Sequence, residues 1–352
     1  MDSRQQGLQQ WVGQQLAQLG VDLEPGWSLE VVSGDASFRR YFRVRSHNLS
    51  WIAVDAPPDK EDSHPFVAIA HAWQPLEIHV PVVHAVDFDA GYMLLSDLGD
   101  ELYLPHLNAA SADELYRKAL LTLTHIQQCR AIGERPLPPY DKALLQREVD
   151  LFSDWFIPQL LQLNLSEAEQ HTLQGAYEVL IGSALEQPQV CVHRDYHSRN
   201  LMLTESGTPG VIDFQDAVWG PLTYDLVSLL RDCYIDWPDD LVRGWALNYA
   251  TQAVEAGIIA PVEDRLFLRW FDLMGMQRHL KAVGIFARLL LRDGKPGYLD
   301  DIPRTFGYLL QVSAHYPELQ AFRTLLVQRV LPAMQACGHF ADSALERLDR
   351  LA

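Results

Sequence analysis

Cysteine is scarce in this sequence. Its 352 residues include four cysteines, Cys129, Cys191, Cys233 and Cys337, and no two of them form a Cys-x-x-Cys pair. Scattered thiols of this kind supply neither a disulfide framework nor the paired ligands of a structural zinc site. We therefore expect a protein of a reducing compartment that is stabilised by a hydrophobic core.

Long apolar runs are also missing. No run of about 18 apolar residues, the length of a membrane-spanning helix, occurs in the sequence. The most apolar late segment, residues 282–291, is interrupted by Arg288. Residues 1–20 are rich in glutamine and lack the apolar stretch that a signal peptide needs. These absences predict a cytoplasmic protein without a membrane anchor.

Positive charge is in short supply. Lys and Arg total 28 against 46 Asp and Glu, which gives a formal net charge of −18 at pH 7. A surface this acidic disfavours sequence-independent binding to nucleic acids or anionic membranes. A nucleotide could bind only where metal ions or local Arg and Lys side chains neutralise its phosphates. Nothing in the sequence indicates an obligate protein partner.

The hydrophobic pattern divides the chain into two parts. The first part begins with a helix over 8–19, continues as short strands and contains one further helix over 66–73. The second part is mostly helical apart from short strands over 189–214. This predicts an α+β fold with a small β-rich N-lobe, residues 1–97, and a larger, mainly helical C-lobe, residues 98–352. The expected strands of the N-lobe cover residues 28–32, 41–45, 51–54, 80–87 and 92–95.

The most informative segment is residues 190–230. It contains the tripeptide His193-Arg194-Asp195, a strand that starts after Asn200, a turn, and a second strand that ends at Asp213. Pairing of these two strands would bring Asn200 and Asp213 close together. We expect Asp195, on the preceding loop, to face the same space.

This arrangement suits phosphoryl transfer. Magnesium must bridge the β- and γ-phosphates of a nucleotide, and it prefers oxygen ligands such as those of Asn200 and Asp213. A separate carboxylate, here Asp195, is needed to accept the proton of the acceptor hydroxyl. The order His-Arg-Asp, Asn and then Asp at the end of a hairpin is typical of kinase catalytic segments.

Two other interpretations of the same residues stay open. His193 and His197 are four residues apart and could be a metal pair on a helix, although Arg194 stands where such a motif has Glu. Asp213 could be a turn residue without a ligand role. The ordered set favours phosphoryl transfer, with a buried His193 that braces the loop.

The same segment resembles a known family. Residues 193–200, the tripeptide Ile212-Asp213-Phe214 and residues 221–226 resemble the aminoglycoside-phosphotransferase-like kinases. The resemblance implies a two-lobed protein-kinase-like fold that uses ATP and Mg²⁺. It also implies that Asp195 is the catalytic base, that Asn200 and Asp213 bind magnesium, and that Asp225 braces the catalytic loop.

Three other segments, residues 33–43, 54–58 and 275–281, resemble the amino-sugar kinases of cell-wall recycling within that family. Those kinases phosphorylate the anomeric hydroxyl of N-acetylmuramate and N-acetylglucosamine, so the resemblance implies an amino sugar as the small-molecule partner. The nucleotide contacts expected from the resemblance include the turn residues Gly34 and Ser37 and the hinge residues Ser96 and Leu98.

One feature of the kinase pattern is absent. Kinases usually pair a Lys on the third strand with a Glu on the next helix. Here the strand ends in Asp55, and residues 64–73 contain no Glu. We expect Arg39, Arg43 or the neighbouring Arg40 to neutralise the phosphates instead, unless these arginines only cover a solvated strand face.

The acceptor site should also contain a cation, because N-acetylmuramate carries a carboxylate. Arg278 and Lys281 are candidates, since they lie three residues apart on one helix face. A solvated basic face would show the same spacing. The other expected sugar contacts are His197 and Arg199.

Two other functions remain open at this point. An acidic protein of this fold could phosphorylate an aminoglycoside, which is polycationic. The missing Lys–Glu pair would also permit a nucleotide-binding pseudokinase. The presence of Asp195, Asn200 and Asp213 argues against the pseudokinase, which has no need for a base.

Overall fold

The computed structural model describes residues 2–34, 38–133 and 136–352. The chain forms two compact units. The first comprises residues 1–106 with the segments 129–137 and 199–217, and the second contains the rest. Ser37, one of the expected nucleotide contacts, lies outside the described residues. The lobe boundary expected between residues 97 and 98 stays a prediction.

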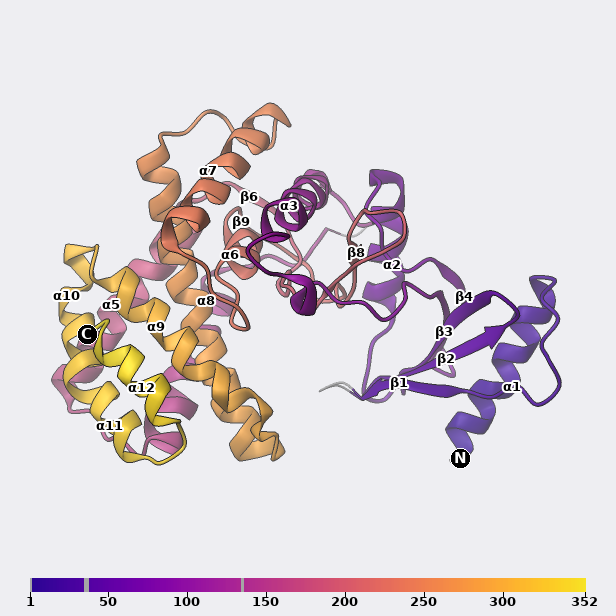
Figure 1. The fold of residues 1–352 in the computed structure, drawn as a ribbon, viewed down its shortest axis with the longest axis horizontal. Helices are drawn as coiled ribbons and strands as arrows, with labels where there is room; N and C mark the ends of the chain where they lie inside the picture. Colours follow the sequence, from indigo (N-terminus) through magenta and orange to yellow (C-terminus); the bar gives the residue numbers. More distant parts are fainter. Residues whose placement is uncertain (1, 35–37, 134–135) are drawn as a thin grey trace. The chain divides into compact units, whose positions relative to one another are not determined.

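The first unit is built on a five-stranded antiparallel sheet of order β1-β2-β3-β5-β4. All five strands were predicted from short apolar runs bounded by turn residues, and their positions are confirmed to within a few residues. The two helices α1 and α2 are confirmed as well (Figure 1). The bounds are α1 Ser3–Gln18, β1 Glu30–Gly34, β2 Arg40–Ser46, β3 Leu49–Asp55, α2 His64–Trp73, β4 Val83–Asp87 and β5 Tyr92–Ser96.

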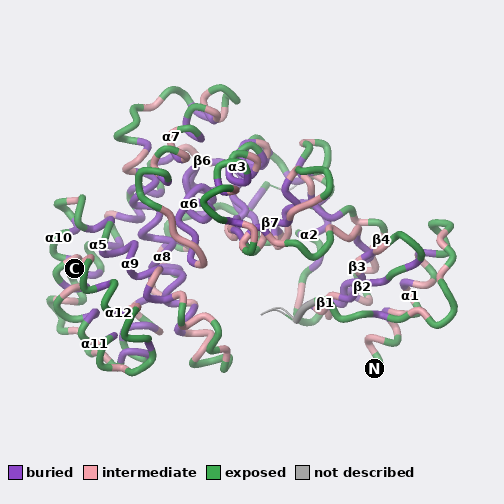
Figure 2. Tube along the Cα trace, in the orientation of Figure 1, coloured by how far each residue is buried: buried purple, intermediate pink, exposed green. Residues whose placement is uncertain are grey.

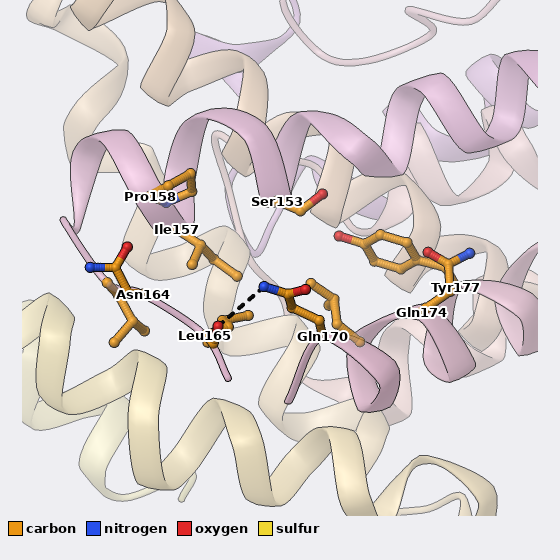
Figure 3. A pocket seen from close by; sticks show the side chains of 10 residues that line it. Ser153, Ile157, Pro158, Asn164, Leu165, Gln170, Gln174 and Tyr177 are labelled. Carbon is orange, nitrogen blue, oxygen red and sulfur yellow. Dashed lines mark hydrogen bonds between the residues drawn. The ribbon is translucent and has the colours of Figure 1, made fainter. Parts of the chain in front are cut away.

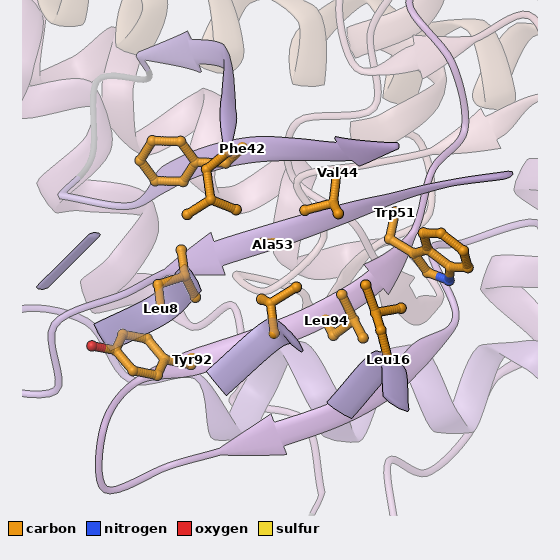
Figure 4. Close-up of a cluster of buried hydrophobic side chains, with 10 residues drawn as sticks. Leu8, Leu16, Phe42, Val44, Trp51, Ala53, Tyr92 and Leu94 are labelled. Atoms are coloured by element: carbon orange, nitrogen blue, oxygen red, sulfur yellow. The ribbon is translucent and has the colours of Figure 1, made fainter. Parts of the chain in front are cut away.

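Helix α1 packs on this sheet through one apolar stripe. Leu8, Val12 and Leu16 recur every four residues, so they lie on one helix face and are all fully buried. They form one cluster with sheet residues that include Val44 and Leu94 (Figure 4). The N-terminal helix is therefore part of the core of the first unit.

A short hairpin completes the first unit. Its strands are β7, Leu201–Met202, and β8, Gly210–Val211. The hairpin is hydrogen-bonded to the chain that follows β5, because Tyr103 N donates to Leu201 O (2.8 Å) and Leu203 N donates to Glu101 O (2.7 Å). The strands predicted over 189–214 are thereby confirmed.

The second unit is mainly helical, as predicted. Its 30-residue helix α8 is buried along most of its length and contacts α4, α5, α6 and α9 (Figures 1 and 2). A helix enclosed by others on all sides needs little amphipathic pattern. The helices are α3 Ala112–Gln128, α4 Lys142–Leu151, α5 Glu167–Glu186, α6 Tyr224–Leu230, α7 Asp239–Glu255, α8 Asp264–Asp293, α9 Ile302–Ser313, α10 Gln320–Leu325, α11 Leu331–Ala336 and α12 Asp342–Asp349.

Two irregular features matter for the site. A π-helical segment, η3 Phe152–Leu160, continues α4, and a two-stranded sheet of β6, Gln189–Val192, and β9, Val218–Pro221, lies before α6. The expected α+β fold, with an antiparallel sheet region and a larger helical part, is confirmed. Within the described residues, no helix is long and apolar enough to cross a membrane.

Candidate active site

The hairpin β7–β8 brings Asn200 and Asp213 together in the first unit. The Asn200 Nδ2 and Asp213 Oδ2 atoms are 3.3 Å apart, and Ile212 N donates to Asn200 O at 3.2 Å. Gln215 Nε2 donates to the other carboxylate oxygen of Asp213 at 2.8 Å. Asp213 has a left-handed backbone with φ 63°, a conformation that Asp tolerates better than most residues. The proximity of Asn200 and Asp213 predicted from strand pairing is confirmed.

This pair fits a magnesium ion by its chemistry. A carboxylate and an amide oxygen are hard oxygen donors, and a magnesium ion bound with a nucleotide usually takes only one or two protein ligands. A half-turn of the Asn200 amide about its terminal bond would present its oxygen beside Asp213. Among the described residues, no cluster of three or more His, Cys, Asp or Glu side chains suits a metal ion, so an all-protein metal cage is not present there.

In the second unit, Asp225 holds the loop of residues 193–198. Asp225 belongs to the first turn of α6 and is fully buried. Its carboxylate accepts hydrogen bonds from His193 N (2.6 Å) and Arg194 N (3.0 Å). Burial raises its pKa to about 7, against the lowering effect of those two bonds. The carboxylate therefore fixes the backbone directly before Asp195.

Asp195 lies among positive charges. Burial alone would raise the pKa of Asp195, but the charges of Lys281, His197 and Arg278 outweigh it and hold the pKa below its ordinary value. Its backbone N donates to His193 Nδ1 at 3.2 Å, which makes that nitrogen the unprotonated one in the ring. Asp195 is thus a carboxylate at neutral pH, as a proton acceptor must be.

The metal-pair interpretation of His193 and His197 is wrong. Residues 193–198 do not form a helix, so the spacing of four does not place the two rings on one helix face. His193 is fully buried and packs edge-on against Tyr196. His197 packs its ring edge-on against Tyr234, with the ring centres 5.4 Å apart.

The basic face of α8 is buried and is not a solvated surface. Lys281 Nζ lies 2.8 Å from Tyr224 OH and 3.1 Å from Glu148 Oε1, and Arg278 Nη1 lies 3.5 Å from Cys233 Sγ. Their residues are 8% and 6% exposed. Lys281 is therefore held by Glu148 and Tyr224 inside the protein. The sugar contact expected of Arg278 and Lys281 stays a prediction.

Glu148 is a member of this cluster that the sequence did not single out. It lies on α4 and accepts hydrogen bonds from Arg194 Nη2 (2.7 Å), Gln277 Nε2 (3.3 Å) and the hydroxyl of Tyr140. One signal could have found it. Glu148 is a charged residue within the buried helix face that also contains Leu145 and Val149, and such a residue needs partners.

The three arginines expected to neutralise the phosphates have different partners. Arg43 donates to Asp97 (2.5 and 3.0 Å), to both carboxylate oxygens of Asp100 (2.7 and 2.8 Å) and to Gly99 O. Arg40 binds Asp55, which Arg4 of α1 also binds. Arg39 lies 3.2 Å from Glu61, directly before α2.

The burial of these side chains tests whether the arginines only cover a solvated strand face. Arg39 and Arg43 are only 6% and 7% exposed, so the interpretation of a solvated strand face is wrong for both. The guanidinium of Arg43 is fully used in holding residues 97–100. Arg39 and Glu61 form a cation–carboxylate pair between the residue before β2 and the segment before α2.

The two expected hinge residues have different neighbours. Ser96 Oγ accepts a hydrogen bond from Val82 N at 2.8 Å. A Cβ atom placed on Gly210 would come within 3.0 Å of Leu98 Cδ1, so Leu98 packs directly on the hairpin that carries Asp213. Gly34 ends β1, where it pairs with Arg40, and Arg199 is exposed.

A pocket of about 330 Å³ lies elsewhere in the second unit, between η3 and α5 (Figure 3). Its lining includes Ser153, Ile157, Gln170 and Tyr177, and none of the ten residues that line it is charged. It offers no cation for a phosphate and contains none of the predicted site residues.

Comparison with known sequences agrees with this geometry. The model of the Phosphotransferase enzyme family matches residues 28–262. The chain therefore belongs to this family of phosphoryl-transferring enzymes, as the resemblance indicated.

Curated relatives match most of the chain. A protein of Pseudomonas putida named N-acetylmuramate/N-acetylglucosamine kinase is 46% identical over 331 residues, which cover 93% of this chain and 97% of the relative. A protein of Neisseria meningitidis serogroup B with the same name is 41% identical over 312 residues, which cover 87% of this chain and 92% of the relative.

Solved structures share the fold at low identity. The choline kinase LicA from Streptococcus pneumoniae superposes with a TM-score of 0.60 at 11% identity, over 88% of this chain and 100% of that chain. The aminoglycoside 2'-phosphotransferase-IIIa, in its GDP complex, gives 0.55 at 13% identity, over 87% and 98%. Together they show a two-lobed kinase-like fold.

Proposed function

We propose that this protein is an ATP-dependent kinase that phosphorylates the anomeric hydroxyl of N-acetylmuramate and N-acetylglucosamine, as part of cell-wall recycling in the cytoplasm. The observation that carries the reaction type is the Asn200–Asp213 pair at the end of the hairpin, five and eighteen residues after Asp195. The acceptor is inferred from the names of relatives that are 41–46% identical over most of the chain.

Asp195 is the proposed base. Its neighbours keep it ionised, so it can accept the proton of the acceptor hydroxyl as the oxygen attacks the γ-phosphate. An anomeric hydroxyl is more acidic than an ordinary alcohol, and a loose transition state needs only modest deprotonation. A single carboxylate therefore suffices for this acceptor.

Asn200 and Asp213 would hold magnesium, which on binding supplies positive charge beside the nucleotide phosphates. The Gln215 hydrogen bond orients the Asp213 carboxylate and leaves its second oxygen toward Asn200. One carboxylate oxygen of Asp213 therefore accepts the hydrogen bond from Gln215, and the other faces Asn200, where the magnesium ion would bind.

Arg39 is the proposed cation that replaces the missing third-strand Lys. In kinases the Lys of this pair is held by a carboxylate, and a guanidinium can make charge-assisted hydrogen bonds to phosphate in place of that Lys. Arg39 is buried, and it lies 3.2 Å from the carboxylate of Glu61. Arg43 and Arg40 are less suitable because each already binds two aspartates.

The test is a coupled assay of ADP release with N-acetylmuramate, N-acetylglucosamine, their 1-O-methyl glycosides and an aminoglycoside, with phosphorus NMR of each product. We expect turnover of both free sugars to a 1-phosphate and no turnover of the glycosides, which lack the anomeric hydroxyl. Equal activity on the glycosides would exclude the anomeric position. Activity on the aminoglycoside alone would show that the acceptor is an aminoglycoside and not an amino sugar.

A further inference from the structure

We propose that the buried pair Glu148–Lys281 is a positioning device for the catalytic base. Glu148 anchors Arg194, the residue directly before Asp195, and holds Lys281 in the same buried cluster. The inference rests on the proposed role of Asp195 and adds two residues to it. This role requires no contact between either residue and the substrate. Both belong to the second unit, as does Asp195.

Glu148 is the centre of the device because its carboxylate is saturated. Arg194 and Lys281 bind one of its oxygens, at 2.7 and 3.1 Å, and Tyr140 and Gln277 bind the other. The side chain is 6% exposed. A buried carboxylate with this many donors has one defined orientation, so the groups that bind it are fixed as well.

Arg194 transmits that orientation to the base. It directly precedes Asp195 and has a left-handed backbone with φ 79°, a conformation that costs a long side chain about 1 kcal/mol or more. Three contacts hold it there: the bond of its N to Asp225, its ion pair with Glu148 and its position over the Tyr140 ring. The strained backbone at residue 194 is therefore maintained from the side-chain end by Glu148.

Lys281 sets the charge around Asp195. The groups that act on Asp195 are Lys281 and Arg278 from α8, His193 and His197 from its own loop, and Asp225 and Tyr224 from α6. Lys281 is the strongest of the cations, and Glu148 and Tyr224 fix its ammonium group. Lys281 therefore lowers the pKa of Asp195.

These opposite charges give opposite expectations for pH dependence. Removing the positive charge of Lys281 should raise the pKa of Asp195, so the acidic limb of kcat/KM moves to higher pH. Removing the negative charge of Glu148 should lower the pKa of Asp195 further, so the acidic limb of kcat/KM should not move to higher pH. A purely structural role would not give shifts of opposite sign.

The experiment measures kcat and KM for ATP, N-acetylglucosamine and N-acetylmuramate from about pH 3.5 to 9 in Lys281→Met, Lys281→Arg and Glu148→Gln. For Lys281→Met we expect an acidic limb displaced upward by about one pH unit or more, and Lys281→Arg should keep the wild-type limb. For Glu148→Gln we expect kcat to fall by about tenfold or more, with all three KM values within about threefold. Circular dichroism verifies that each variant is folded.

The outcomes separate the two proposals. If Asp195→Asn retains turnover, Asp195 is not the base, and the positioning role of Glu148 and Lys281 is refuted as well. If Asp195→Asn is inactive while Lys281→Met keeps the wild-type pH profile, only the positioning role is refuted. A rise in the KM for N-acetylmuramate alone in Lys281→Met would also refute it, because that result assigns Lys281 to the lactyl carboxylate.

Should Lys281→Met fail to fold, Lys281→Gln decides the question, because it removes the same charge and keeps a hydrogen-bond donor for Glu148 and Tyr224. We expect it to show the same upward shift of the acidic limb. Lys281→Gln with the wild-type profile would overturn the inference.

Discussion

Asn200 and Asp213 are separated by 13 positions in the sequence, yet their side chains lie 3.3 Å apart because the β7–β8 hairpin closes between them. The hairpin is in turn fixed by main-chain hydrogen bonds to residues 101 and 103 and by the packing of Leu98 on Gly210. The proposed metal ligands thus sit on a short but well-supported element.

Asp213→Asn should lower kcat by at least about tenfold and raise the Mg²⁺ concentration needed for half-maximal rate, because it removes the charge that binds the ion. Asn tolerates the left-handed backbone at residue 213, so the variant should fold normally. The measurement is a Mg²⁺ titration of the initial rate. Gln215→Ala is the matched control. It removes only the bond that orients the carboxylate, and it should have the smaller effect; the reverse order would contradict the ligand assignment.

Asp195→Asn should lower kcat by about 100-fold or more, roughly 3 kcal/mol of barrier, with little change in the KM for the sugar. The substitution keeps the shape of the side chain and removes the proton acceptor. Steady-state kinetics at saturating ATP measure the effect. Near-normal turnover would remove Asp195 from the role of base.

Arg39→Ala should raise the KM for ATP by roughly ten- to a hundredfold, which corresponds to about 1.5–3 kcal/mol for a charge-assisted contact to phosphate. Arg40→Ala is the control, because Arg40 is adjacent but is bound to Asp2 and Asp55. If neither variant changes the ATP kinetics, magnesium must supply most of the neutralisation.

Arg43→Met should lower the free energy of unfolding of the first unit by about 3–5 kcal/mol, because it leaves Asp97 without its cation. The side chains of Arg43 and Asp97 are 8% and 5% exposed. Arg45→Ala, on the same strand, removes a pair whose side chains are 56% and 55% exposed and should have little effect. Urea denaturation compares the two variants, and equal midpoints would contradict the buried-pair argument.

The loss of stability at acidic pH should depend in part on His279. Burial, together with the charges of Arg278 and Arg231, lowers its pKa from 6.5 to about 3, although its Nε2 lies 2.9 Å from Arg231 O. As the pH falls below 6.5, the unfolded chain therefore binds a proton at His279 that the folded protein does not bind. The contribution of His279 to the free energy of unfolding is fully present above pH 6.5 and is lost as the pH falls toward 3.

His279→Gln should reduce this loss, since Gln does not titrate and can still donate to Arg231 O. Thermal unfolding between pH 7 and 4 measures the slope. His315→Gln, an exposed position, should leave the slope unchanged. An unaltered slope in His279→Gln would assign the acid sensitivity to other groups.

Local pattern and motif spacing predicted much of this molecule. Short apolar runs between turn residues located the five strands of the first unit, and the hairpin motif placed Asn200 beside Asp213, because both depend on residues that are close in sequence. The partners of the arginines could not be predicted in this way. Arg43 meets Asp97 across 54 positions, and Lys281 meets Glu148 across 133, so only the folded chain brings them together.

The left-handed backbone at Arg194 also has a consequence for how these sequences can change over time. Glycine at position 194 would remove the backbone strain, but it would leave Glu148 facing Lys281 with one positive charge fewer. Substitutions at positions 148, 194 and 281 are therefore expected to occur together rather than independently. Covariation of positions 148, 194 and 281 in an alignment of relatives would show that these buried charges are maintained as a group.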